Sequence, residues 1–135
     1  MGNLRGSPGY GSQMQGTSEP KRVVVADNDA EWRELLRTDL SLEGHQVVAV
    51  CASGEEALDA CREHRPDVLV VDERMPPGLN GVEVARRLRE TDPGVQVVVF
   101  TNFDEEEIIK GAADAGAVFV LKGNLRALRA ALTLA

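Results

Sequence analysis

The chain has 135 residues, enough for one domain, with 43% hydrophobic residues, 4% aromatic residues and a formal net charge of −7. This charge argues against a nucleic-acid-binding surface, which would need a basic stripe, and no run of residues is apolar for long enough to span a membrane. With so few aromatic side chains, the core must consist of Val, Leu, Ile and Ala, a composition that suits a parallel sheet covered on both faces.

The first twenty residues differ in composition from the rest of the chain. Residues 1–20 are rich in Gly, Ser, Gln, Asn and Pro, which bury too little surface to offset the entropy of ordering. We therefore expect a disordered tail ahead of one domain at 21–135. The tail has no apolar signal core, and Cys51 and Cys61 belong to no C-x-x-C pair. We expect a cytoplasmic protein whose two thiols are buried and reduced.

An alternation of strand and helix begins after the tail. The apolar run at 22–26 predicts the first strand. Apolar residues then recur at steps of three and four, which predicts a helix over 29–42, and Gly44 is typical of the residue that ends such a helix. The next strand is expected at 46–51.

A capping signal and a turn rich in Pro and Gly indicate where the next two helices begin. Ser53 is followed three residues later by a glutamate, which is typical of a capping box and predicts a helix over 53–64. An apolar strand is expected at 67–71. After a turn rich in Pro and Gly, a third helix is expected over 80–91.

The last part of the chain repeats the alternation. We expect a strand at 95–100, a helix over 104–116 capped by Asp104, and a strand at 117–121. Asn124 is expected to cap a short helix that runs to the last residue. The order is thus (βα)₅, and right-handed crossovers between parallel strands lead to a three-layer α/β sandwich.

Polar residues stand where four of the expected strands end. Asp27 and Asn28, Asp72, Thr101 and Lys122 follow successive apolar runs, at the sheet edge where open α/β folds bind ligands. Each residue alone has an ordinary explanation as a cap, a turn former or a surface charge. Together, carboxylates that converge there need a cation, and oxygen ligands select a hard ion such as Mg²⁺. A carboxylate flanked by Mg²⁺ and an ammonium group can accept a phosphoryl group.

These segments resemble the receiver domain of the bacterial two-component response regulators, from about residue 21 to the end. The matching segments are 25–28, 70–76, 80–81, 99–101 and 119–122. The resemblance implies a flavodoxin-like, doubly wound parallel sheet with strand order 2-1-3-4-5. It also implies a phosphoacceptor signalling domain that acts as a phosphoprotein in a phosphorelay, and not as an enzyme with turnover.

The resemblance also implies which residues accept the phosphoryl group and hold the metal ion. Asp72 would accept a phosphoryl group from a sensor histidine kinase or a phosphotransfer protein. Asp27, Asn28 and Asp72 would hold Mg²⁺ together with the backbone carbonyl of Arg74.

Three further roles follow from the same resemblance. Thr101 and Lys122 would contact phosphoryl oxygens, and Phe119 would turn inward as Thr101 shifts. This movement would reshape the face made by the fourth helix, the fifth strand and the fifth helix, where partners bind and where a homodimer is possible. Candidates for this surface, or alternatively for the core, are Ile108, Ile109, Val118, Leu125 and Leu128.

The sequence departs from the family pattern at four places. Asn28 replaces the usual second acidic residue, and Asn102 replaces a smaller residue beside Thr101. Gly123 replaces the proline after the lysine, so we expect a trans peptide bond there. The turn at 76–80 is about one residue longer than usual.

Two other functions are compatible with the residues. Asn28 and Asn102 favour a receiver-like binding module that is impaired in phosphorylation. A phosphatase of the haloacid dehalogenase type would use Asp27 as nucleophile and Asp29 as acid/base. That pattern is incomplete, because Glu31 stands where Thr or Val is normal and the late acidic pair is missing.

Overall fold

The computed structural model describes residues 19–135, so the tail predicted at 1–20 lies almost wholly outside the described residues. The strands are β2 (Arg22–Ala26), β3 (Gln46–Cys51), β4 (Val68–Val71), β5 (Gln96–Thr101) and β6 (Val118–Leu121). The helices are α1 (Ala30–Leu42), α2 (Gly54–His64), α3 (Gly81–Thr91), α4 (Glu106–Asp114) and α5 (Leu125–Leu134). Each expected element is present, with most boundaries within about one residue.

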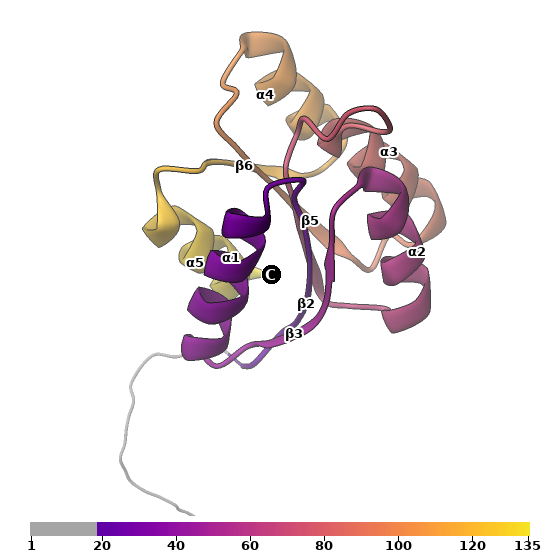
Figure 1. Ribbon diagram of the computed structural model, residues 1–135. Coiled ribbons are helices and arrows are strands. Elements are labelled where there is room, and N and C mark those ends of the chain that lie inside the picture. The colour runs from indigo at the N-terminus through magenta and orange to yellow at the C-terminus, as the bar shows by residue number, and fades with distance from the viewer. Residues whose placement is uncertain (1–18) are drawn as a thin grey trace, which may run out of the picture.

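The five strands form one parallel sheet in the order β3-β2-β4-β5-β6. Counted along the described chain, this order is 2-1-3-4-5, and the predicted flavodoxin-like α/β fold is confirmed. Helices α1 and α5 cover one face of the sheet, and α2 and α3 cover the other (Figure 1). The first and third strands in chain order, β2 and β4, lie next to each other, so their carboxyl ends meet at one edge.

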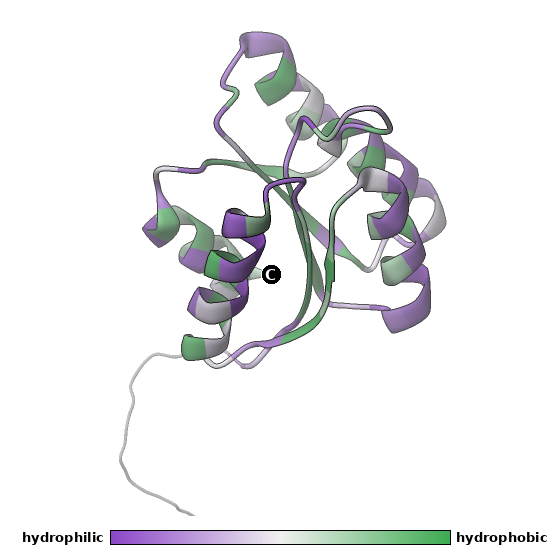
Figure 2. Cartoon of the chain, viewed as in Figure 1, coloured by the Kyte–Doolittle hydropathy of each residue, from purple (hydrophilic) through white to green (hydrophobic). Residues whose placement is uncertain are grey.

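The core is two apolar layers separated by the sheet. Val23 and Val25 of β2 pack with Leu36, Leu40 and the α5 leucines. The alternate residues of β2 face the opposite layer, with α2, α3 and α4. Both faces are therefore buried, as expected for a valine-rich parallel sheet, and the strands appear as apolar segments between helices with polar outer faces (Figure 2).

Two of the predicted helix caps, Ser53 and Asn124, are present. Ser53 Oγ accepts from the Glu56 amide at 3.1 Å, although Glu56 Oε1 accepts from the amide of Ala52 (2.8 Å) and so leaves the capping box incomplete. Asn80 and Glu83 form a complete capping box on α3. The Asn124 side chain caps α5, because its Oδ1 accepts from the Ala127 amide at 3.0 Å.

The prediction that Asp104 caps the fourth helix is wrong. Helix α4 begins two residues later, at Glu106, with Glu105 in the cap position and no side-chain hydrogen bond there. Asp104 therefore lies too far from the helix amides that a cap residue serves. The helix also ends earlier than expected, at Asp114, because Gly116 turns the chain with a φ of +76°.

The structure also bears on the two cysteines, on the peptide bond before Gly123 and on the length of the helices. Cys51 and Cys61 are free and buried, and burial raises their thiol pKa values to about 11 and about 12. Among residues 19–135 the one cis peptide bond joins Pro76 and Pro77, so the bond before Gly123 is trans as expected. No helix in this part of the chain has the length and apolar character to cross a membrane.

Candidate functional site

Three ionisable side chains meet at the carboxyl edge of the sheet. The Lys122 Nζ lies 2.7 Å from Asp27 Oδ2 and 3.3 Å from Asp72 Oδ2. The exposed fractions are 5% for Lys122, 1% for Asp27 and 6% for Asp72. One buried ammonium group therefore joins carboxylates from the ends of β2 and β4. We call Asp27, Asp72 and Lys122 the charged triad.

Backbone groups orient both carboxylates of the triad. Asp27 Oδ1 accepts from the Asp29 amide at 2.9 Å, and Asp72 Oδ1 accepts from the Glu73 amide at 2.8 Å. In each case the other oxygen, Oδ2, faces the lysine. The orientation of each carboxylate is thus set by the loop that follows its strand, before any ligand binds.

Burial raises the pKa of Asp27 above its ordinary value, and the nearby negative charge of Asp72 raises it further. The hydrogen bonds from Lys122 and from the Asp29 amide oppose this shift. Desolvation by burial is the largest of these effects, so the pKa of Asp27 lies above its ordinary value. A second cation at this edge would favour the ionised form of Asp27.

Thr101 and Trp32 complete the surroundings of the triad. Thr101 ends β5, has no exposed surface, and its Oγ1 accepts from the Phe103 amide at 3.4 Å. The ring centroid of Trp32 lies 4.9 Å from the Lys122 Nζ. Trp32 is therefore placed to report on changes around the lysine.

The remaining predicted site residues lie further out. Asn28 is exposed, and Phe119 is half-buried and packs on the layer formed with α2, α3 and α4. The Arg74 side chain is exposed, where it pairs with Glu105 at 3.1 Å and lies 3.8 Å above the Phe103 ring.

The donor chemistry at this edge fits a hard metal ion. Asp27 and Asp72 already converge on one cation, the Lys122 ammonium, and Asn28 and the Arg74 carbonyl would add only oxygen donors. Residues 19–135 contain no cluster of three or more His, Cys, Asp or Glu side chains with metal-site geometry. A complete metal site would therefore depend on the side-chain amide oxygen of Asn28 and the backbone carbonyl of Arg74.

Sequence reasoning missed Glu73. Its side chain is only 6% exposed, and Oε1 accepts from the Val82 amide at 2.9 Å. Burial raises the pKa of this carboxyl despite that hydrogen bond. Capping signals are read within a few residues of a helix start, whereas Glu73 lies nine residues before the amide that it binds, so no local pattern could reveal it.

Comparison with known proteins then decides the family. The model of the response regulator receiver domain matches residues 23–133. The chain belongs to this family. Receiver domains are phosphoacceptor modules of two-component signal transduction and work with histidine kinases, so the phosphatase alternative is set aside.

Individual relatives agree with this assignment. The oxygen regulatory protein NreC of Staphylococcus epidermidis is 36% identical over 109 residues, which are 76% of this chain and 48% of the relative. The signal receiver domain of the putative response regulator NarL from Mycobacterium tuberculosis is 38% identical with a TM-score of 0.73, covering 77% of this chain and 85% of that one. This receiver chain spans about half the length of the curated relatives that it matches.

A more distant structure supports the fold. In the CheX-CheY-BeF₃-Mg²⁺ complex from Borrelia burgdorferi, the matching chain has a TM-score of 0.76 at 21% identity. The match covers 86% of this receiver chain and 90% of that chain.

Proposed function

We propose that Asp72 accepts a phosphoryl group from the phosphohistidine of a sensor histidine kinase or a phosphotransfer protein. The observation that carries the proposal is the buried contact of Lys122 with both Asp27 and Asp72. A carboxylate oxygen of Asp72 attacks phosphorus, the P–N bond to histidine breaks, and an acyl phosphate forms. The Lys122 ammonium then pairs with a phosphoryl oxygen, and the Thr101 hydroxyl donates to another.

Mg²⁺ is the cofactor of this proposal. Asp27, Asp72, Asn28 and the Arg74 carbonyl would hold it, as the oxygen-only donor set suggests. When bound, Mg²⁺ neutralises charge on the transferring phosphoryl oxygens.

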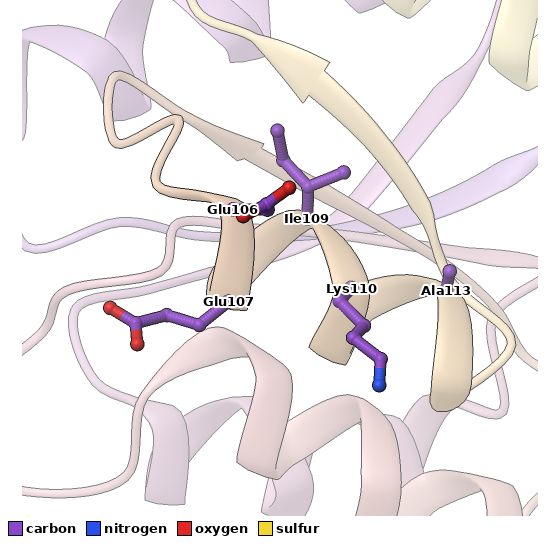
Figure 3. A pocket seen from close by; sticks show the side chains of 5 residues that line it. All are labelled: Glu106, Glu107, Ile109, Lys110 and Ala113. Carbon is purple, nitrogen blue, oxygen red and sulfur yellow. The ribbon is translucent and has the colours of Figure 1, made fainter.

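The proposed output is a change of the face formed by α4, β6 and α5. Thr101 moves toward the phosphoryl group, and the half-buried Phe119 follows it inward. Ile109, Val118 and Leu121 expose 39–42% of their surface on this face, and Ile109 lines a hollow along α4 with Lys110 (Figure 3). Such an apolar patch fits a partner protein or a second copy of the chain.

Location and partner class are part of the proposal. Histidine kinases draw their phosphoryl groups from ATP, so we place the protein in the cytoplasm, and the free buried Cys51 and Cys61 agree with a reducing compartment. The net charge of −7 favours protein partners over direct binding of nucleic acid.

Acetyl phosphate with Mg²⁺ tests phosphorylation without knowledge of the kinase. We expect the intact mass of the wild type to rise by one phosphoryl group, and Asp72→Asn to show no gain while it stays folded by circular dichroism. An unchanged wild-type mass would contradict the proposal.

A second candidate function is a receiver-like binding module with impaired phosphorylation. It is favoured by Asn28 in a position that is usually acidic and by Asn102, a bulkier residue than usual beside Thr101. A titration of Trp32 fluorescence with Mg²⁺ separates the two functions. A response at millimolar Mg²⁺ supports the phosphoacceptor, and a flat titration supports the module.

A further inference from the structure

Glu73 is a buried charged side chain that the proposed phosphotransfer does not use. It follows Asp72 directly and forms three hydrogen bonds that link two parts of the structure. Its amide donates to Asp72 Oδ1 at 2.8 Å, its carbonyl accepts from the Gly81 amide at 2.9 Å, and its Oε1 accepts from the Val82 amide at 2.9 Å. One residue thus binds both the phosphoacceptor and the start of α3.

Two of these hydrogen bonds provide acceptors for backbone N–H groups in the first turn of α3. A helix begins with N–H groups that find no acceptor inside the helix. The amides of Gly81 and Val82 donate to Glu73, and the amide of Glu83 donates to Asn80 Oδ1 at 2.8 Å. Two of these three acceptors come from Glu73, outside the helix.

The first turn of α3 is also packed directly on Asp72. A Cβ at Gly81 would lie 2.4 Å from the Asp72 carbonyl oxygen, closer than atoms tolerate. A displacement of this turn is therefore transmitted to the Asp72 backbone by contact as well as by hydrogen bonds.

We propose that Glu73 is a positioning residue that holds the Asp72 carboxylate in register with the first turn of α3. The inference rests on the proposed role of Asp72. With Oδ1 bound to the Glu73 amide, Oδ2 faces Lys122. Reacting groups lose about a hundredfold in rate when they are misplaced by roughly 1 Å, so the Glu73 contacts bear directly on phosphoryl transfer.

Three variants test this role. Glu73→Leu removes the acceptor for the Val82 amide, and Glu73→Gln keeps an acceptor oxygen there. Glu83→Leu is the matched control, because it breaks the other cap of the same turn, the Asn80 amide to Glu83 Oε1 bond of 3.1 Å.

Phosphorylation by acetyl phosphate with Mg²⁺ is timed for each variant, and thermal melts verify that each is folded. We expect Glu73→Leu to react about tenfold more slowly or worse, Glu73→Gln to recover to within about twofold of the wild type, and Glu83→Leu to keep the wild-type rate. A wild-type rate in Glu73→Leu, or an equal loss in Glu83→Leu, would overturn the inference.

An NMR comparison separates this inference from the proposed function. The carboxyl ¹³C resonance of Asp72 and the exchange of the Gly81 and Val82 amides should change in Glu73→Leu, and neither should change in the Gln variant. If the wild type takes up no phosphoryl group, the proposed function fails and these spectra still decide the role of Glu73. Unchanged spectra in Glu73→Leu would refute it.

Discussion

The charged triad carries more negative than positive charge when both carboxyls are ionised. Lys122 faces Asp27 and Asp72 at 2.7 and 3.3 Å in nearly complete burial. Attraction offsets the desolvation of buried charges only when each has a partner. Burial is the largest cause of the raised pKa of Asp27, and the charge of Asp72 adds to it. Two buried carboxylates beside one ammonium group are the physical reason to expect affinity for a divalent cation.

Removing the ammonium group should therefore destabilise the fold. We expect Lys122→Met to lower the free energy of unfolding by about 3–5 kcal/mol at neutral pH, because it leaves two buried carboxylates unpaired. The loss should shrink as the pH falls, because protonation of Asp27, whose pKa burial raises, removes one of the unpaired charges. Urea unfolding measures both values.

The matched control is Lys110→Met on the exposed surface of α4. It should change the free energy of unfolding by no more than about 0.5 kcal/mol. Equal effects of the two substitutions would show that the triad has no special energetic role.

Glu73 provides a pH test with a defined sign. Burial raises its folded pKa, so its contribution to stability is fully present below the unfolded pKa and is lost as the pH rises through the folded pKa. Glu73→Gln removes this titration, so its stability relative to the wild type should increase as the pH rises from the unfolded pKa of a glutamate through the raised folded pKa. Urea unfolding at several pH values measures the difference, and a difference independent of pH would contradict the assignment.

At the scale of elements, the start of α3 connects fold and site. Asn80 and Glu83 close the capping box from within the helix, and Glu73 supplies acceptors from the preceding loop. Gly81 lies against the Asp72 carbonyl, where a side chain does not fit. A shift of the helix would therefore move the loop that carries Asp72.

Gly81→Ala tests this close contact. A methyl group 2.4 Å from the Asp72 carbonyl oxygen should cost about 1–3 kcal/mol in the free energy of unfolding. Gly94→Ala is the control, because nothing lies within 4 Å of a Cβ there, and it should be neutral or slightly stabilising. Denaturant unfolding of both variants checks the pair; a tolerated Gly81→Ala would mean that the turn can move.

The elements themselves could be predicted because their signals are local. Valine runs, helical spacing and the caps Ser53 and Asn124 each depend on residues close in sequence. The cap at Asp104 was predicted wrongly because an aspartate followed by acidic residues is typical of a helix start. In the structure, Glu105 takes the cap position. The long-range contacts of Glu73 and the pairing of Arg74 with Glu105 have no signal in sequence spacing.

At the scale of the whole molecule, the two apolar layers leave one partly apolar face open. Residue type and spacing alone cannot separate core from surface among the candidates for a dimer surface, which are Ile108, Ile109, Val118, Leu125 and Leu128. Ile108 is 8% exposed and Leu128 is fully buried, whereas Ile109 and Val118 are about 40% exposed. The candidate dimer surface therefore contains fewer of these residues than the sequence indicates, because Ile108 and Leu128 belong to the core.

Self-association after phosphorylation tests this surface. We expect Ile109→Ser and Val118→Ser each to weaken a phosphorylation-dependent dimer by about tenfold, because each loses apolar area buried between copies. Leu42→Ser is the control, because Leu42 is an exposed apolar residue at the end of α1, and it should leave the dimer unchanged. Sedimentation velocity with and without acetyl phosphate measures the effect. A dimer that tolerates both serines would use another surface.

Chemical trapping can show whether Asp72 itself carries the phosphoryl group, as we propose. Borohydride converts an aspartyl phosphate to homoserine, which tandem mass spectrometry of the digested chain can assign to one residue. After treatment with acetyl phosphate and Mg²⁺, we expect homoserine at position 72 alone. Homoserine at Asp27, or at no aspartate in a chain that has been shown to bind Mg²⁺, would contradict the claim.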